Sequence, residues 1–107
     1  MTTHARFTKA QQLFEIRRFR EAIAEIKLVL EADDADHYRG EALELLARAN
    51  FGAAYLKEAE RLARLMIEHN PTHAYAHTLL VRSLERQSRR AEADKAARLA
   101  TAVGAEF

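Results

Sequence analysis

The feature that most restricts the fold of this chain is a recurrence on either side of its single proline, Pro71. Leu46 and Ala59 before the proline return as Leu80 and Ala93 after it, 34 residues further along in both cases. Proline lacks a backbone N–H and its ring clashes with the preceding turn, so a helix must end before it. A period of about 34 residues that holds two helices is typical of an α-helical repeat.

Composition agrees with a helical globular chain. Its 107 residues are the size of one domain, and 49% of them are apolar, which argues against disorder. Three glycines and one proline leave few helix-breaking positions. The absence of cysteine excludes disulfides and thiolate metal sites and suits a reducing compartment, so we expect a cytoplasmic protein. No apolar run approaches the ~20 residues of a membrane helix, and no signal-peptide core follows Met1.

Apolar periodicity predicts six helices. The clearest stripe is Ala22, Ile23, Ile26, Val29 and Leu30, which lie on one helix face. The predicted segments are 3–16, 19–32, 36–51, 55–69, 72–87 and 89–103.

Short polar and glycine positions separate these segments. Asp33, Asp34 and Asp36 offer side chains that could cap the third helix at its N-terminus. Gly52 stands where a C-cap glycine would end that helix, and Gly104 is expected to stop the sixth.

The two halves of each period resemble the tetratricopeptide repeat family. That family has a large residue, Leu, a small residue and Tyr at fixed spacing in its first helix, then Ala and an aromatic residue in its second helix and a closing Pro. The matching residues are Arg6, Lys9, Ala10, Leu13, Ala22 and Ile26; then Leu43, Leu46, Ala47, Asn50, Ala59, Ala63 and Pro71; then His77, Leu80, Val81, Leu84, Ala93 and Ala97. The chain departs from the pattern in having no Trp at the large position, alanine at two of the aromatic positions, and three extra residues near 33–36.

This resemblance implies an all-α fold, an α-solenoid of three antiparallel helix pairs with a right-handed superhelix. We expect one domain, residues 1–107, with repeats at about 3–35, 36–71 and 72–107. The small residues would let helix axes approach closely, and larger ones would fill the space between pairs. A plain helical bundle with accidental periodicity is the alternative fold.

The resemblance also implies a non-enzymatic adaptor that binds a peptide or protein partner in a concave groove lined by the first helices. Carried over to this chain, the partner-binding residues are Phe7, Gln11, Phe14, Glu44, Arg48, Phe51, Tyr75, Thr78, Arg82 and Arg86. Arg48 and Arg82 are equivalent, being 34 residues apart, and the planar guanidinium fork suits carboxylates and phosphates. The alternative is that these arginines only pair with nearby glutamates such as Glu44 and Glu85 and solvate the surface.

Metal, cofactor and catalytic roles are not expected. His69, His73 and His77 are spaced four apart, as a zinc-binding helix face would require, but Pro71 interrupts the helix between the first two. His77 also occupies a packing position of the repeat. The sequence has no Gly-rich phosphate loop, and its two serines lack the context of a nucleophile.

Two other functions stay open. The chain could be a self-associating structural module that forms a homodimer through its C-terminal helix, where Leu99, Val103 and Phe107 are expected on an uncovered end. It could also bind an anionic partner such as RNA along a basic edge, although few aromatic residues lie there and nucleic acid is therefore an unlikely partner. The basic edge would comprise Arg17, Arg18, Arg20, Lys57, Arg86, Arg89 and Arg90.

Overall fold

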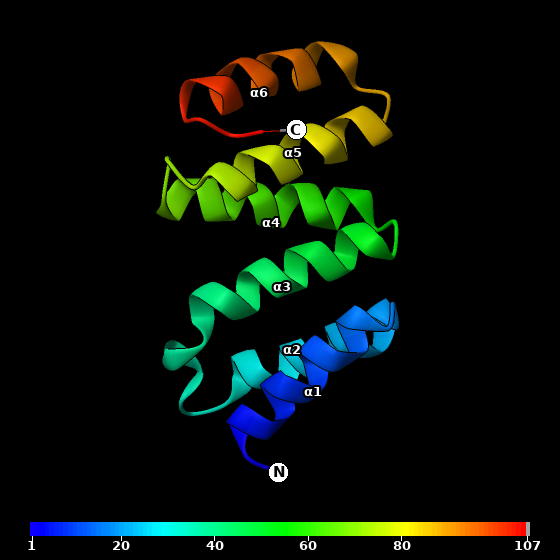
Figure 1. Cartoon of the computed structure of the whole chain (residues 1–107), viewed down its shortest axis with the longest axis vertical. Coiled ribbons are helices and arrows are strands. Elements are labelled where there is room, and N and C mark those ends of the chain that lie inside the picture. The colour runs from blue at the N-terminus through cyan, green and yellow to red at the C-terminus, as the bar shows by residue number, and fades with distance from the viewer. Residues whose placement is uncertain (107) are drawn as a thin grey trace. The chain divides into compact units, whose positions relative to one another are not determined.

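The computed structural model describes residues 1–106, and within them it contains six α-helices, one short 3-10 helix and no strand (Figure 1). The elements are α1 (Thr3–Glu15), α2 (Phe19–Glu31), η1 (Ala35–His37), α3 (Arg39–Gly52), α4 (Leu56–His69), α5 (Ala74–Arg86) and α6 (Arg90–Ala102). The all-α prediction is confirmed, and the six helices coincide with the six apolar segments to within three residues at either end.

The chain divides into two compact units, Met1–Ala54 and Tyr55–Phe107. In the first unit α2 packs against both α1 and α3, and α1 also touches α3. In the second unit α5 packs against both α4 and α6. The division falls between α3 and α4, so the expected second repeat gives one helix to each unit.

The predicted small packing positions are buried. Ala22 on α2 and Ala59 on α4 have no exposed surface, and Ala93 on α6 is 4% exposed. Ala10, Ala47 and Val81 in the first helices are buried as well. Small buried side chains of this kind let neighbouring helices approach each other closely.

Three turns share one backbone form. The residue after the C-cap is left-handed in each: Arg17 (φ 63°), Ala54 (φ 64°) and Ser88 (φ 59°). After α5, the N–H groups of Ser88 and Arg89 donate to the carbonyls of Glu85 and Leu84 at 2.9 and 3.1 Å. This is the Schellman arrangement that ends many helices. The left-handed positions follow each other at 37 and 34 residues, which is the spacing of Ala22, Ala59 and Ala93.

The start of α3 differs from its prediction. The aspartates at 33–36 do not cap it: Ala35 is buried, the chain forms the 3-10 turn η1, and α3 begins after Tyr38 without a side-chain cap. Asp34 instead accepts a hydrogen bond from the Thr3 hydroxyl at 2.7 Å. The segment around the buried Ala35 is thus a 3-10 turn, although the sequence suggested that a helix starts there.

The connection around Pro71 is held by side chains. Asn70 Oδ1 accepts hydrogen bonds from the N–H and hydroxyl of Thr72. The ring of His73 caps α5, because its Nδ1 accepts the N–H of Ala76 at 3.3 Å. His77 is buried, and its Nε2–H donates to the carbonyl of Pro71 at 2.7 Å.

Glu25 of α2 joins the first helix pair. Its carboxylate lies 2.8 Å from Arg6 Nη1 and 3.1 Å from Lys9 Nζ, both on α1. Burial alone would raise the pKa of Glu25, but hydrogen bonds from Lys9 and Arg6 outweigh this effect and hold its pKa below the ordinary value.

Glu60 of α4 is the centre of a second polar network. It accepts hydrogen bonds from Arg64 on its own helix, and from Gln87 and Arg89 at the α5–α6 turn. Glu92 of α6 continues the network by pairing with Arg89 at 2.6 Å. Burial would raise the pKa of Glu60, yet its hydrogen-bond donors lower it below the ordinary value of 4.5.

The buried alanines give a prediction for stability. Ala59→Leu should overpack α4 and lower the free energy of unfolding by about 1–3 kcal/mol. Thermal or urea denaturation measures this, and an unchanged stability would contradict the packing register described above.

The Glu60 network gives a prediction for pH dependence. Because its pKa is lowered on folding, Glu60 stabilises the folded state above the ordinary carboxyl pKa, and this contribution is lost as the pH falls below about 4.5. Urea denaturation between pH 7 and pH 3 should therefore show a shallower acid loss of stability for Glu60→Gln than for the wild type.

Candidate functional site

Two phenylalanines and two arginines form a continuous row of contacts in the first unit. Phe14 of α1 and Phe19 of α2 meet edge to face, with ring centroids 5.5 Å apart and planes at 64°. The guanidinium carbon of Arg48 on α3 lies 5.0 Å from the centroid of Phe14, and that of Arg17 lies 5.2 Å from the centroid of Phe19. We name Phe14, Arg17, Phe19 and Arg48 the arginine–phenylalanine cluster.

Backbone geometry sets the positions of this cluster. The left-handed conformation of Arg17 turns the chain sharply after α1, so Phe19 at the start of α2 comes beside Phe14. The ring of Phe19 also lies against Gly52 at the end of α3. A Cβ atom on Gly52 would lie 2.6 Å from Cζ of Phe19, closer than real Cβ atoms come. The glycine predicted as a C-cap is therefore a helical residue that allows close approach, and Ala54 is the left-handed residue of the turn.

The cluster combines apolar surface with oriented positive charge. A guanidinium group over an aromatic face gains roughly 0.5–1 kcal/mol at an exposed site, and the ring restricts its orientation. Arg17 and Arg48 are both exposed, whereas Phe14 and Phe19 are half-buried. A ligand here would meet guanidinium N–H donors next to the uncovered parts of two aromatic rings, which suits a carboxylate beside an apolar group.

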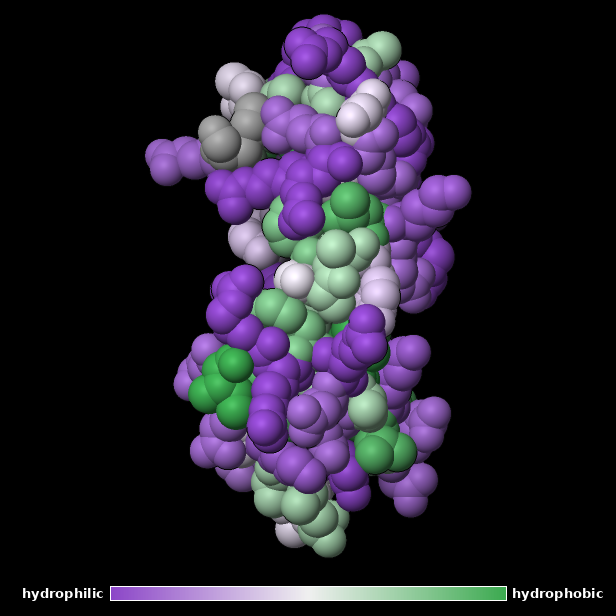
Figure 2. All heavy atoms as spheres, turned by 90° about the vertical axis from the view of Figure 1, so that its right-hand side faces the viewer, coloured by the Kyte–Doolittle hydropathy of each residue, from purple (hydrophilic) through white to green (hydrophobic). Residues whose placement is uncertain are grey.

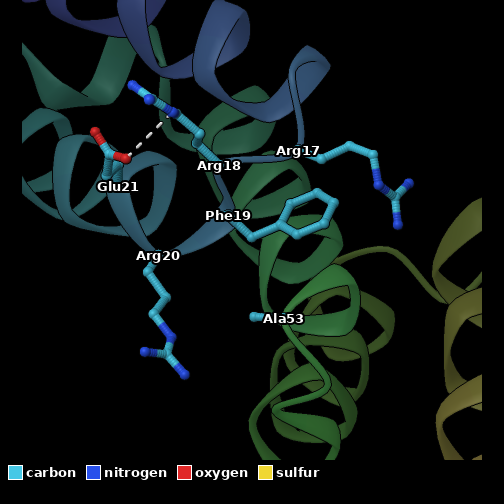
Figure 3. Close-up of a pocket in the computed structure, with 6 residues that line it drawn as sticks. All are labelled: Arg17, Arg18, Phe19, Arg20, Glu21 and Ala53. Carbon is cyan, nitrogen blue, oxygen red and sulfur yellow. Dashed lines mark ion pairs between the residues drawn. The ribbon is translucent and has the colours of Figure 1, made fainter.

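A pocket of about 290 Å³ adjoins the cluster at the α1–α2 turn. Figure 3 shows Arg18 turned toward Glu21, with which it pairs at 3.6 Å, while Arg17 lies beside the ring of Phe19 and Arg20 extends away from it. Figure 2 shows that on the side of the molecule that carries this turn, hydrophilic side chains are interrupted by apolar areas. The pocket is therefore a basic depression with one aromatic wall.

The structure brings together some of the predicted partner-binding residues of the first unit. Arg48 of α3 and Phe14 of α1 are in contact. Gln11 is exposed, and Glu44 and Phe51 are half-buried on α3. Phe7 differs, because it is 5% exposed and its ring packs against that of Tyr38 at 5.5 Å. Phe7 is thus a core residue of the first unit.

The predicted residues of the second unit all lie on α5. Arg82 and Arg86 are exposed, and Tyr75 is half-buried. Thr78 is buried, and its hydroxyl donates a hydrogen bond to the carbonyl of Glu106 at 2.8 Å. The hydroxyl of Thr78 is therefore already hydrogen-bonded to the segment that follows α6. Phe107, which the sequence placed in a dimer contact, lies outside the described residues.

Sequence reasoning divided the cluster between two hypotheses. It assigned Phe14 and Arg48 to the groove, and Arg17 to a basic edge on which Phe19 was one of the few aromatic residues. The signal for their association was weak, since it consists of Phe19 directly after the arginines of a turn and of a glycine at the end of the third helix.

The predicted basic edge is in part neutralised. Arg18 pairs with Glu21, and Arg89 pairs with Glu60 and Glu92. Arg17 and Arg20 belong to the pocket of the first unit, whereas Arg86, Arg89 and Arg90 lie near the α5–α6 turn of the second.

The histidines serve the fold. His69 bonds through Nδ1 to the carbonyl of Leu65 at 2.9 Å, and His73 and His77 hold the connection before α5. Within residues 1–106, no three His, Cys, Asp or Glu side chains are grouped so that they could bind a metal ion. None of the described helices has the length and apolar character needed to cross a membrane.

No protein-family model matches this chain, and comparison with curated proteins and with solved structures finds no significantly similar protein.

The contact of Gly52 with Phe19 gives a prediction for the cluster. Gly52→Ala should push the ring of Phe19 away and weaken its contacts with Phe14 and Arg17, which offsets the helix-propensity gain of alanine of about 1 kcal/mol. Gly40→Ala on the same helix is the matched control, because nothing lies within 4 Å of its added Cβ. We expect the control to gain up to about 1 kcal/mol. Equal effects of the two substitutions in urea denaturation would contradict the close approach.

Proposed function

We propose that this chain is a non-enzymatic protein-interaction module of the tetratricopeptide type, with three antiparallel helix pairs, that binds an acidic segment of a protein partner. Two findings support the repeat: the left-handed turn residues recur at spacings of 37 and 34, and the small packing positions are buried with the same spacing. An adaptor of this kind needs no cofactor.

The contact between Arg48 and Phe14 carries the assignment of the binding surface. These residues come from α1 and α3, the first helices of two successive proposed repeats. In a tetratricopeptide array such helices line the ligand groove. An arginine held over a phenylalanine there offers donors to a carboxylate and a ring edge to an apolar side chain.

The partner segment would be extended or helical, with an acidic group beside an apolar anchor. Hydrogen bonds to a charged group are worth about 1.5–3 kcal/mol each, so one lost arginine should weaken binding about tenfold or more. Arg82, which is exposed on α5 and equivalent to Arg48 in the repeat, is proposed as a second contact.

RNA binding is the second candidate, and the pocket at the α1–α2 turn is the observation that favours it. Arg17 and Arg20 supply positive charge there, and Phe19 supplies one ring for base stacking. A single aromatic residue between arginines is a weak stacking platform, so we rank this function below peptide binding.

The test begins with a displayed library of random peptides selected on the wild-type protein. The bound peptides should be enriched in Asp and Glu next to an apolar residue. Calorimetry with a selected peptide should then give an affinity at least about tenfold weaker for Arg48→Ala and for Arg82→Ala. Thermal stability should change little, because both arginines are exposed.

Arg98→Ala is the control, because Arg98 is an exposed arginine on α6, a helix that carries none of the proposed groove residues. Arg64 is unsuitable, since it pairs with Glu60 at 3.0 Å. Equal loss of affinity in the control and the groove variants would place the ligand elsewhere. Salt-sensitive retention of RNA by a protein that selects no peptide would favour the second candidate.

A further inference from the structure

The second unit carries an apolar groove that the proposed function does not use. It has a volume of about 400 Å³ and lies between α4 and α6, with α5 as its floor. Ile67, Leu80, Ala96 and Leu99 form its apolar lining, and Arg64 and Glu68 of α4 stand at its rim. A smaller depression of about 190 Å³ continues it along α6.

Leu99 stands out among these residues. It is 56% exposed on α6, while Leu80 and Ala96 beside it are buried. The same surface therefore presents both a projecting leucine and an apolar hollow next to it. A two-fold symmetric interface requires such a self-complementary surface, because each copy must supply both parts of the contact.

The charges around the groove indicate the kind of partner. Arg64 and Lys95 are basic, and Glu68 and Glu92 are acidic, so the rim has two charges of each sign. Arg64 and Glu92 already approach each other at 3.8 Å. Glu68 and Lys95 are exposed and form no ion pair among the residues that the structure describes. A strongly acidic or basic partner would be repelled by half of this rim, whereas the rim of a second copy carries both signs in equal number.

We propose that this groove binds a second copy of the chain, with Leu99 of each copy inserted into the groove of the other. The dimer uses residues of the second unit, none of which belongs to the arginine–phenylalanine cluster. Its small apolar contact corresponds to a weak interface, with a dissociation constant of about 10–100 µM.

Sedimentation equilibrium of the full chain from about 10 µM to 1 mM, a range that brackets this affinity, tests the proposal. The wild type should shift from monomer to dimer with concentration. Leu99→Glu should weaken the dimer roughly 100-fold, because each substitution enters the interface twice and places a charge against apolar surface. Leu28→Glu is the matched control: Leu28 is an exposed leucine, 45% accessible, on α2 of the first unit, and its substitution should leave dimerisation unchanged.

A mixing experiment tests the reciprocal insertion. Leu99→Ala removes the projecting side chain without placing a charge in the groove that Leu99 also lines, and Ala96→Leu keeps Leu99 but fills the groove. Each variant alone should be monomeric, whereas their mixture should form a heterodimer through the one remaining contact. Circular dichroism checks that each variant folds, and Ile67→Glu, at the half-buried groove wall, replaces Ala96→Leu if the latter does not.

Several results would overturn the proposal. They are a monomeric wild type at the highest concentration, a dimer that survives Leu99→Glu, equal loss in Leu28→Glu, and failure of two folded variants to associate on mixing. The peptide test depends on Arg48 of the first unit and Arg82 of the second, and neither residue lines this groove, so a negative result here leaves the proposed function unaffected.

Discussion

The close approach of helices at small side chains is the constraint on which the rest of this structure depends. In each unit the middle helix packs against both of its neighbours, which requires short distances between helix axes on two sides. Alanines without exposed surface, such as Ala22 and Ala59, provide these distances. Larger side chains there would separate the helices and expose the apolar stripes that drive their association.

The arginine–phenylalanine cluster follows from the same constraint. Only when α3 lies close to α1 and α2 can Arg48 reach the face of Phe14 and the ring of Phe19 rest on Gly52. The cluster is therefore built by tertiary packing on regular helices, and rigid elements position its side chains better than a loop would. Arg17, the fourth residue of the cluster, lies in the left-handed turn between α1 and α2 and reaches the ring of Phe19 from there.

Periodicity predicted the helices well, because a stripe such as Ala22, Ile26 and Val29 directly reflects the face that a helix buries. It could not predict contacts that depend on where a distant segment folds. Phe7 was expected at a groove but packs on Tyr38, which follows the unpredicted 3-10 turn. Thr78 is occupied because the chain turns back after Gly104 and brings the carbonyl of Glu106 to it. The contact between Phe19 and Gly52 likewise could not be predicted from the sequence.

The order of contacts within each unit has a consequence for how the chain folds. The helices that pack extensively are successive in the sequence, α1 with α2 and α2 with α3, then α4 with α5 and α5 with α6. Closing these contacts requires loops of only a few residues, so little chain entropy is lost before apolar surface is buried. Topologies with such low contact order fold within microseconds to milliseconds. Each three-helix unit can therefore form its core rapidly from local encounters, which limits the time for which its apolar stripes are exposed to other chains.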